Sequence, residues 1–278
     1  MSHLSLNEWY RGVTISTLWY GVLALVLIAV LAGCAQKEKK KYVERPVEDL
    51  YNEALDLMEE RQYASASERF DEVERQHPYS GWATKAQLLG GYSYYLANRY
   101  DEAILALDRF MQLHPANKDV AYAMYLKGLS YYEQISDVAR DQKITELALT
   151  AFKELISRFP KSKYARNAAI KTELTYDHLA GKEMEIGRYY HGQNQYLAAI
   201  NRFKKVVDSY QTTTHVPEAL HRLTEAYLAL GVNEEARRTA AVLGHNFPGS
   251  EWYIDSYEML ENKSVRNEEP RAPWWKVW

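Results

Sequence analysis

The sequence repeats with a period of 37 residues. Ala54, Gly91 and Gly128 follow one another at this spacing, and the same interval separates Gly187 from Thr224. A large apolar residue comes three residues after each of these small residues: Leu57, Tyr94, Tyr131, Tyr190 and Tyr227. Self-similarity with a period of about 20–50 residues indicates repeated structural units, each of which buries its apolar face only against its neighbours.

The second half of each unit has its own pattern, which begins with alanine and a larger apolar residue four positions later. The pairs are Ala66/Phe70, Ala103/Leu107, Ala148/Phe152 and Ala199/Phe203, with Ala236/Ala240 as the weakest. Four units end in proline, at Pro78, Pro115, Pro160 and Pro248, and the fourth unit has Gln211 there instead. A small residue lets two helices approach closely, and proline ends a helix because it lacks the N–H. The pattern resembles the tetratricopeptide repeat and predicts an all-α solenoid of five helical hairpins over residues 47–250.

The spacing breaks twice. Between Gly128 and Ala148 the interval is 20 residues instead of the usual 12, which predicts an inserted loop over Ser136–Glu146. After Pro160 the sequence predicts one long first helix from about Ser162 to His191, which Gly181 could interrupt. Insertions in a solenoid lie in loops on one face, often a binding face.

The amino terminus has the pattern of an export signal. Arg11 is followed by the mostly apolar stretch Val13–Ala32, and the small residues Ala32 and Gly33 lie directly before Cys34, the one cysteine in the chain. These features match a lipoprotein box with cleavage before Cys34. We therefore expect a signal peptide at 1–33 and a lipidated Cys34 with its tether at 34–46. The alternative is an uncleaved apolar anchor, since about 20 apolar residues can span a bilayer.

Ala35 and Gln36 follow the cysteine, with no aspartate, which in enterobacterial lipoproteins resembles a signal for the outer membrane. No disulfide is available once Cys34 carries lipid. The net charge of −3 does not suggest a nucleic-acid-binding protein. We expect no cofactor other than the covalent lipid.

The sequence also lacks the patterns of an active site. The histidines are scattered, and Glu183, Glu185 and His191 do not have the spacing of metal ligands. A solvated helix face explains these three residues more simply. The sequence therefore predicts no catalytic residue, no metal site and no enzymatic activity.

Binding is expected on the concave surface formed by the first helices of the hairpins. Positions one and four residues after the small residue, and three before it, should face this groove. In the first three units they are Tyr51, Leu55, Met58, Leu88, Tyr92, Tyr95, Tyr125, Leu129 and Tyr132. Tyrosine provides a broad apolar area with a polar end, which suits an extended peptide. The alternative is that these tyrosines are simply buried against adjacent hairpins.

The carboxy-terminal extension, residues 251–278, ends in a Trp-rich tail. Pro270 and Pro273 precede Trp274-Trp275-Lys276-Val277-Trp278. Exposed aromatic side chains at this density usually dock on another surface. A partner, the solenoid itself and the membrane interface remain alternatives.

Particular segments resemble the BamD family, the repeat lipoproteins of the machinery that assembles outer-membrane β-barrels. They are Leu50-Tyr51 through Ala66, Phe70–Pro78, Arg140-Asp141-Gln142 in the third repeat, and Asn201-Arg202 in the fourth. The resemblance implies a lipid-anchored protein on the periplasmic face of the outer membrane of a Gram-negative cell. It also implies that amino-terminal repeats meet unfolded barrel proteins and carboxy-terminal repeats bind the POTRA domain nearest the barrel of BamA, with other assembly lipoproteins as further partners.

Arg202 matches the arginine of this family at the POTRA contact. It directly precedes the core residue Phe203, so we expect its side chain to point outward and be free to pair with an acidic partner. The alternative is an ordinary solvated arginine. For the whole chain, the competing hypothesis is a lipoprotein repeat adaptor for cell-wall enzymes or the division apparatus.

Overall fold

The computed structural model describes residues 44–261. The predicted signal peptide, Cys34 and residues 262–278, which include the Trp-rich tail, lie outside the described residues. The described helices belong to one compact unit that begins at Arg45.

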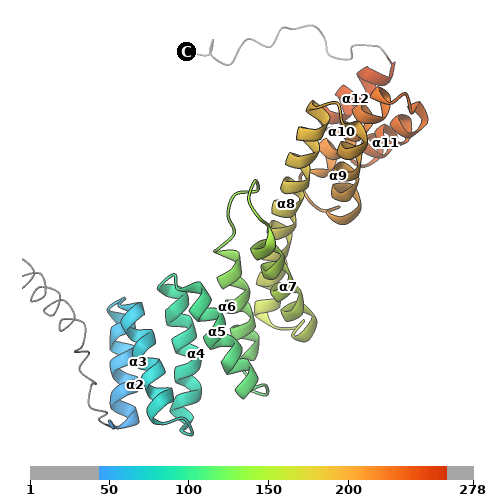
Figure 1. Cartoon of the computed structure of the whole chain (residues 1–278). Helices are drawn as coiled ribbons and strands as arrows, with labels where there is room; N and C mark the ends of the chain where they lie inside the picture. Colours follow the sequence, from blue (N-terminus) through green and yellow to red (C-terminus); the bar gives the residue numbers. More distant parts are fainter. Residues whose placement is uncertain (1–43, 262–278) are drawn as a thin grey trace, which may run out of the picture. The chain divides into compact units, whose positions relative to one another are not determined.

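Every regular element in the described range is an α-helix, and consecutive helices pair as hairpins (Figure 1). The hairpins are α2 (Val47–Glu59) with α3 (Tyr63–Gln76), α4 (Gly81–Leu96) with α5 (Tyr100–Leu113), α6 (Val120–Tyr132) with α7 (Lys143–Arg158), α8 (Lys163–Gly192) with α9 (Tyr196–Ser209), and α10 (Val216–Ala229) with α11 (Asn233–Asn246). A last helix, α12 (Glu251–Glu261), packs on α10 and α11. The prediction of an all-α solenoid of five tetratricopeptide-like hairpins is confirmed.

The repeated small residue lies where the two helices of a hairpin come closest. A β-carbon placed on Gly128 would lie 2.5 Å from Cε1 of Phe152, and one on Gly91 would lie 2.9 Å from Cδ2 of Leu107. Ala54, at the same position of the first hairpin, is fully buried. The 37-residue period therefore reflects helix packing. A larger side chain at the repeated position would overlap the apolar residue of the second helix.

In every hairpin except the third, whose turn contains the inserted loop, the turn uses one residue in the left-handed region. Arg61, Asn98, Asn194 and Gly231 have φ between 59° and 75°. The next residue donates its backbone N–H to the carbonyl of the repeated large residue, as Arg99 does to Tyr94 at 2.9 Å. This bond is the six-to-one hydrogen bond of a Schellman motif, which pairs a carbonyl that the helix end leaves open.

The ends of the second helices share one backbone conformation. His77, His114, Phe159, Tyr210 and Phe247 all have φ near −130° and ψ of 46° to 57°. This conformation lies outside the α region, which a following proline disfavours. Gln211 replaces that proline in the fourth hairpin. Tyr210 still adopts the same conformation there, and its carbonyl accepts a hydrogen bond from the Thr213 hydroxyl at 2.8 Å.

Helix α8 runs without a break for 30 residues (Figure 1). Its first turn is capped by the Ser162 hydroxyl, which accepts from the N–H of Ala165 at 3.0 Å. The expectation that Gly181 could interrupt the helix is wrong. Gly181 is instead a close-approach site, since a β-carbon there would lie 3.3 Å from Nε2 of His215 and 3.5 Å from Val138.

The inserted loop is also shifted from its predicted position. It covers residues 133–142, because α7 already begins at Lys143. The predicted range therefore included the first turn of α7. Gln142 explains the boundary: its side chain bonds to the loop carbonyls of Val138 and Arg140, and its carbonyl accepts from the N–H of Glu146.

Helix α8 belongs to two apolar cores. Ala168, near its start, is buried with the residues of α6 and α7, whereas Ala180 and Met184 are buried with those of α9, α10 and α11. The long helix thus joins the first three hairpins to the last two.

Candidate partner-binding surfaces

A ladder of tyrosines runs across the first helices α4, α6 and α8. The ring centroids of Tyr92 and Tyr122 lie 6.3 Å apart, those of Tyr122 and Tyr164 5.2 Å apart, and those of Tyr125 and Tyr164 5.8 Å apart. All four side chains are half-buried. We call this set, with Tyr95 and Tyr132, the tyrosine ladder. It combines packing between hairpins with a partly accessible aromatic surface.

The hydroxyls of Tyr95, Tyr122 and Tyr125 have raised pKa values and remain protonated well beyond neutral pH. Burial, together with the nearby Glu133, raises the pKa of Tyr95 to about 12. Burial also raises the pKa of Tyr122 and Tyr125. At physiological pH these hydroxyls can therefore donate hydrogen bonds to a bound chain as well as accept them.

The other predicted groove residues do not all lie at the surface. Leu55, Leu88, Leu129 and Met58 are half-buried, as a groove lining requires. Tyr51 is only 8% exposed and packs between Trp82 and Phe70, with ring centroids 4.8 and 5.7 Å away. Tyr51 is therefore a core residue of the first hairpin, because the aromatic Trp82 of α4 covers the face that was expected to be open.

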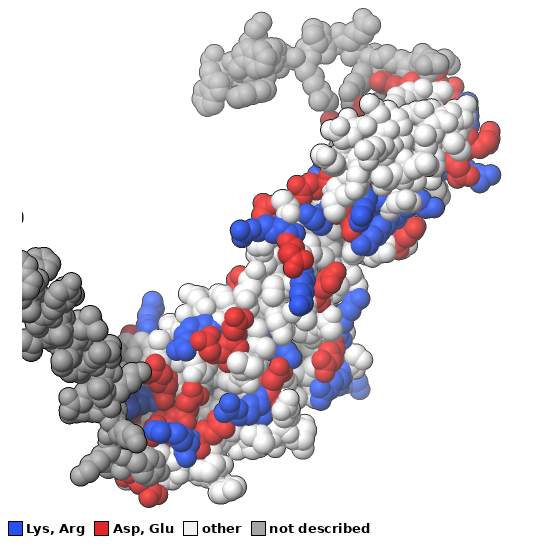
Figure 2. Space-filling model, viewed as in Figure 1, with Lys and Arg blue, Asp and Glu red and all other residues white. Residues whose placement is uncertain are grey.

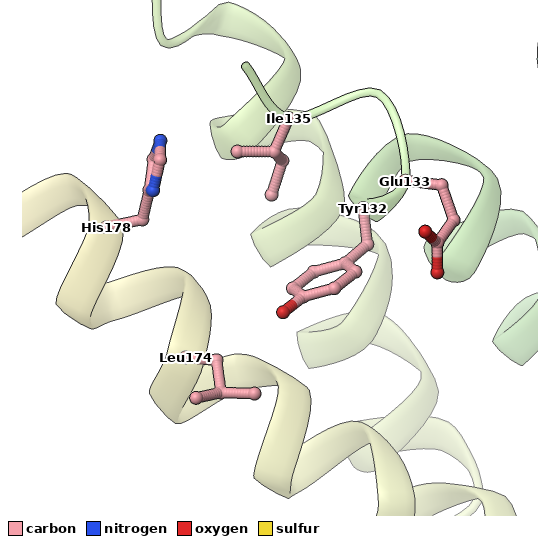
Figure 3. A pocket seen from close by; sticks show the side chains of 5 residues that line it. All are labelled: Tyr132, Glu133, Ile135, Leu174 and His178. Carbon is pink, nitrogen blue, oxygen red and sulfur yellow. The ribbon is translucent and has the colours of Figure 1, made fainter. Parts of the chain in front are cut away.

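A pocket of about 310 Å³ opens between the inserted loop and α8 (Figure 3). Its lining residues are Tyr132, Glu133, Ile135, Leu174 and His178. Leu174 is 50% exposed, and Nε2 of His178 is buried without a hydrogen-bond partner among the described residues. Lys171 places Nζ 4.0 Å from the ring centroid of Tyr132. The insertion thus extends the ladder into a concave surface, which the spacing of the sequence did not reveal.

The predicted partner residue Arg202 is not free. Its Nη1 lies 3.1 Å from the carboxylate of Glu183 on α8, and Lys205 lies 2.6 Å from the other oxygen. The expectation of an unpaired arginine is therefore wrong. The residue does point away from the core beside Phe203, but the hairpin places α8, with its buried Glu183, directly across from it.

The side chain of Arg202 is still 40% exposed, and that of Lys205 is 49% exposed. The hydrogen bond to Glu183 raises the pKa of Lys205. One buried carboxylate therefore holds two cations at the surface of the fourth hairpin in a fixed position. We call Glu183, Arg202 and Lys205 the cationic pair site.

A second charged cluster joins α8, α10 and α12. Arg188 lies 3.0 Å from Glu218, and Nε2 of His191 lies 3.8 Å from Glu225. The buried ring of His221 bonds to Ser256 of α12 through Nδ1 at 2.9 Å. Burial alone would raise the pKa of Glu225, but hydrogen bonds from His221 and Arg222 outweigh it and lower that pKa to about 2.

Other classes of site are not visible over residues 44–261. The described side chains form no group of three or more histidine, cysteine, aspartate or glutamate residues that could hold a metal ion. Within the same range no helix has both the length and the hydropathy of a membrane span. Figure 2 shows positive and negative side chains interspersed over the visible face of the first hairpins, rather than a field of one sign.

Comparisons with known proteins decide the family. A family model described as "YfiO: Outer membrane lipoprotein" matches residues 43–243. A protein of Caulobacter vibrioides is 50% identical over 248 residues, which cover 88% of this chain and 81% of the relative. A protein of Rickettsia prowazekii is 46% identical over 238 residues, which cover 86% and 95%. Both are named "Outer membrane protein assembly factor BamD". The chain belongs to the BamD family.

A third BamD, from Neisseria gonorrhoeae, is 35% identical over 88% of this chain and 92% of its own length. Among solved structures, the P58(IPK) TPR domain matches with a TM-score of 0.41 and 16% identity, over 77% of this chain and 56% of that one. Membership of the BamD family fits an outer-membrane lipoprotein, and an assembly factor is not a class of enzyme.

Proposed function

We propose that this chain is a noncatalytic scaffold on the periplasmic face of the outer membrane, where it takes part in the assembly and insertion of β-barrel proteins. The observation that carries the proposal is identity of about one half to a BamD over 88% of the chain. Lipid on Cys34 would confine the solenoid to the membrane plane. Such confinement raises the effective concentration of the chain beside a membrane-embedded partner.

The lipid anchor at Cys34 can be tested separately, because it lies outside the described residues. We expect Cys34→Ala to leave the chain uncleaved or unlipidated, so that it takes up no labelled fatty acid and, if it is uncleaved, keeps the mass of the precursor. A single buried acyl chain binds only marginally, so the two or three chains of a lipoprotein are needed for stable attachment. Processing and fatty-acid labelling like those of the parent chain would overturn the anchor.

The tyrosine ladder is proposed to meet unfolded barrel substrates. Its rings are half-buried and pack against one another or, for Tyr95 and Tyr132, against Tyr100 and Phe152, so that they lose little side-chain freedom when an extended chain binds. A photo-crosslinker at Tyr92 or Tyr132 should trap barrel precursors in living cells. The matched control is Leu105, which is 67% exposed on the second helix α5. Equal labelling of precursors at Leu105 would contradict a binding surface on the ladder.

The cationic pair site is proposed to contact an acidic surface on the POTRA region of a BamA-like protein. Arginine suits such a contact because its planar guanidinium can bond a carboxylate through two N–H groups. Glu183 engages one edge of Arg202 and leaves the side chain partly exposed. The partner's carboxylate would then share the guanidinium with Glu183.

Extraction in mild detergent through an affinity tag tests the partners. A large β-barrel protein with POTRA domains should co-purify, and Arg202→Gln should reduce its yield. Arg158→Gln is the matched control, since it removes a guanidinium from an exposed ion pair with Glu154 within α7 and leaves the cationic pair site intact. Recovery of cell-wall enzymes or division proteins instead would support the adaptor hypothesis and overturn the assembly role. Equal yields from both variants would keep the function but discard Arg202 as its contact.

A further inference from the structure

Helix α12 has an apolar face that the described structure leaves partly open. One of its residues, Ser256, is buried, whereas the first helices α4, α6 and α10 each have seven buried residues. The difference follows from the repeat, because an inner first helix is covered by the second helix of its own hairpin. Within residues 44–261 no second helix follows α12.

The side chains of α12 divide into two sets. Trp252 and Tyr253 pack against the core of the last two hairpins, and Ser256 bonds to His221. Ile254 and Tyr257 do not belong to that core, and Tyr257 is 41% exposed. Ile254 and Tyr257 are three residues apart, so that they lie on one face of the helix. This outer face of α12, defined by Ile254 and Tyr257, is where the next helix of a longer solenoid would pack.

We propose that the Trp-rich tail of the same chain, residues 274–278, covers the outer face of α12. The tail follows α12 in the sequence after residues 262–273, and three of its five residues are tryptophan. An uncovered solenoid end tends to associate with other surfaces, and repeat proteins normally close it with a terminal cap. The tail would be this cap.

The length of the intervening segment allows the tail to return along the whole helix. Trp274 is 13 residues beyond Glu261, which permits a span of up to about 43 Å. Helix α12 has 11 residues and is therefore only about 16 Å long. Pro270 and Pro273 disfavour a continuing helix, so the tail would cover α12 as an extended strip.

The charges of the two segments are complementary. Helix α12 carries four acidic residues and no basic one. Residues 262–278 carry four basic residues and two acidic ones. Opposite net charge favours the return of the tail, while the tryptophans would bury the apolar area.

Engineered disulfides test the docking directly. In the full chain, Tyr257→Cys is combined with Trp275→Cys, and Ile254→Cys with Trp275→Cys serves as the second pair in case the first disturbs α12. The control pair is Leu105→Cys with Trp275→Cys, since Leu105 is exposed on a distant hairpin. The parent chain, whose one cysteine is Cys34, gives the background rate of disulfide formation. We expect both α12 pairs to close within one chain at least about tenfold faster than the control pair, owing to a raised effective concentration.

Other occupants of the outer face give different products. Disulfides that form only between two chains would overturn the proposal in favour of a second copy. Intramolecular closure that is lost when vesicles of phosphatidylethanolamine and phosphatidylglycerol are added would overturn it in favour of the membrane interface. Equal rates for all three pairs would overturn it as well.

Thermal melting provides a second test that needs no new cysteine. A triple change of Trp274, Trp275 and Trp278 to serine keeps the length and charges of the tail but removes its apolar area. We expect this variant, and a chain that ends at Glu261, to melt about 3–6 °C below the parent chain. An unchanged melting temperature in both would contradict a docked tail.

Discussion

The first three hairpins and the last two join their first helices by different side chains. In the first region, aromatic rings bridge α4, α6 and α8, as in the pair Tyr122 and Tyr164. In the second region, ions bridge α8 and α10, as in Arg188 with Glu218 at 3.0 Å. The repeat geometry is the same in both. The comparison shows that this geometry fixes where the helices lie but leaves the chemistry of the concave side free to differ.

The shared geometry gives the largest expected effect. Gly91→Leu in the first region and Gly187→Leu in the second should each cost about 3 kcal/mol of unfolding free energy, because both side chains would overlap the second helix of their hairpin. Denaturant unfolding measures the loss. Gly192→Leu is the control, since nothing lies within 4 Å of a β-carbon there. A loss in only one region would mean that the two halves do not share one packing rule.

We call the ring contacts between the first helices of the first region the aromatic joint, and the ion pairs between those of the second region the ionic joint. The aromatic joint should contribute more to the free energy of unfolding. Tyr122→Ala removes a half-buried ring that contacts both Tyr92 and Tyr164, and it should cost about 2–3 kcal/mol. The loss should be the same at low and high salt, because the contacts are apolar. Tyr189→Ala, at a ring that is 65% exposed, should change stability little. Unfolding in urea at 0.05 and 1 M salt would measure both, and a salt-dependent loss at Tyr122 would contradict the aromatic joint.

The two regions should also respond to opposite extremes of pH. The pKa of Glu225 is lowered from 4.5 to about 2, so its contribution to stability is present above pH 4.5 and is lost as the pH falls toward 2. Burial also lowers the pKa of His191, so protonation below pH 6.5 opposes the fold. The raised pKa of Tyr95, about 12, acts in the other direction: its contribution is present below pH 10 and is lost as the pH rises toward 12.

Glu225→Gln should therefore lower the melting temperature at pH 7 and change it much less at pH 3. Tyr95→Phe should make the loss of stability between pH 10 and 12 smaller. Glu154→Gln, at an exposed ion pair within one helix, is the control for both. The assignment would be contradicted if the melting temperature fell in acid as steeply in variants that lack Glu225 or His191 as in the parent chain.

The ionic joint gives the smallest effect. Glu218→Gln removes the partly exposed ion pair between α8 and α10. It should lower the free energy of unfolding by about 0.5–1 kcal/mol at low salt. At 1 M salt the difference should nearly vanish, because the screening length falls to about 3 Å. Chemical unfolding at both salt concentrations measures it. A loss that persists at high salt would show that Glu218 acts through packing instead.

The sequence predicted the hairpins well because their cause recurs. A small residue faces the second helix in all five units, and a proline follows the second helix in four of them, so that local requirements of packing and helix ending recur along the chain. The same pattern predicted the long α8, although not its continuity through Gly181. That residue could be read as a break, and its role emerges only when His215 packs against it.

The sites were less predictable, because they depend on single contacts between elements. Glu183 and Arg202 are 19 residues apart and meet only across the α8–α9 hairpin, so no period indicates their pairing. Tyr51 was expected in the groove, but Trp82 covers it. Tyr122 was missed, although it lies three residues before Tyr125 and could have been found by helical spacing.

Crosslinking from one residue in each region tests the central claim, a division of roles between the tyrosine ladder and the cationic pair site. A photo-crosslinker is placed at Tyr92 in one strain and at Lys205 in another, and the trapped proteins are identified. The account predicts barrel precursors at Tyr92 and a POTRA-domain protein at Lys205, with little exchange between them. The same protein at both positions, or neither class at either, would contradict it.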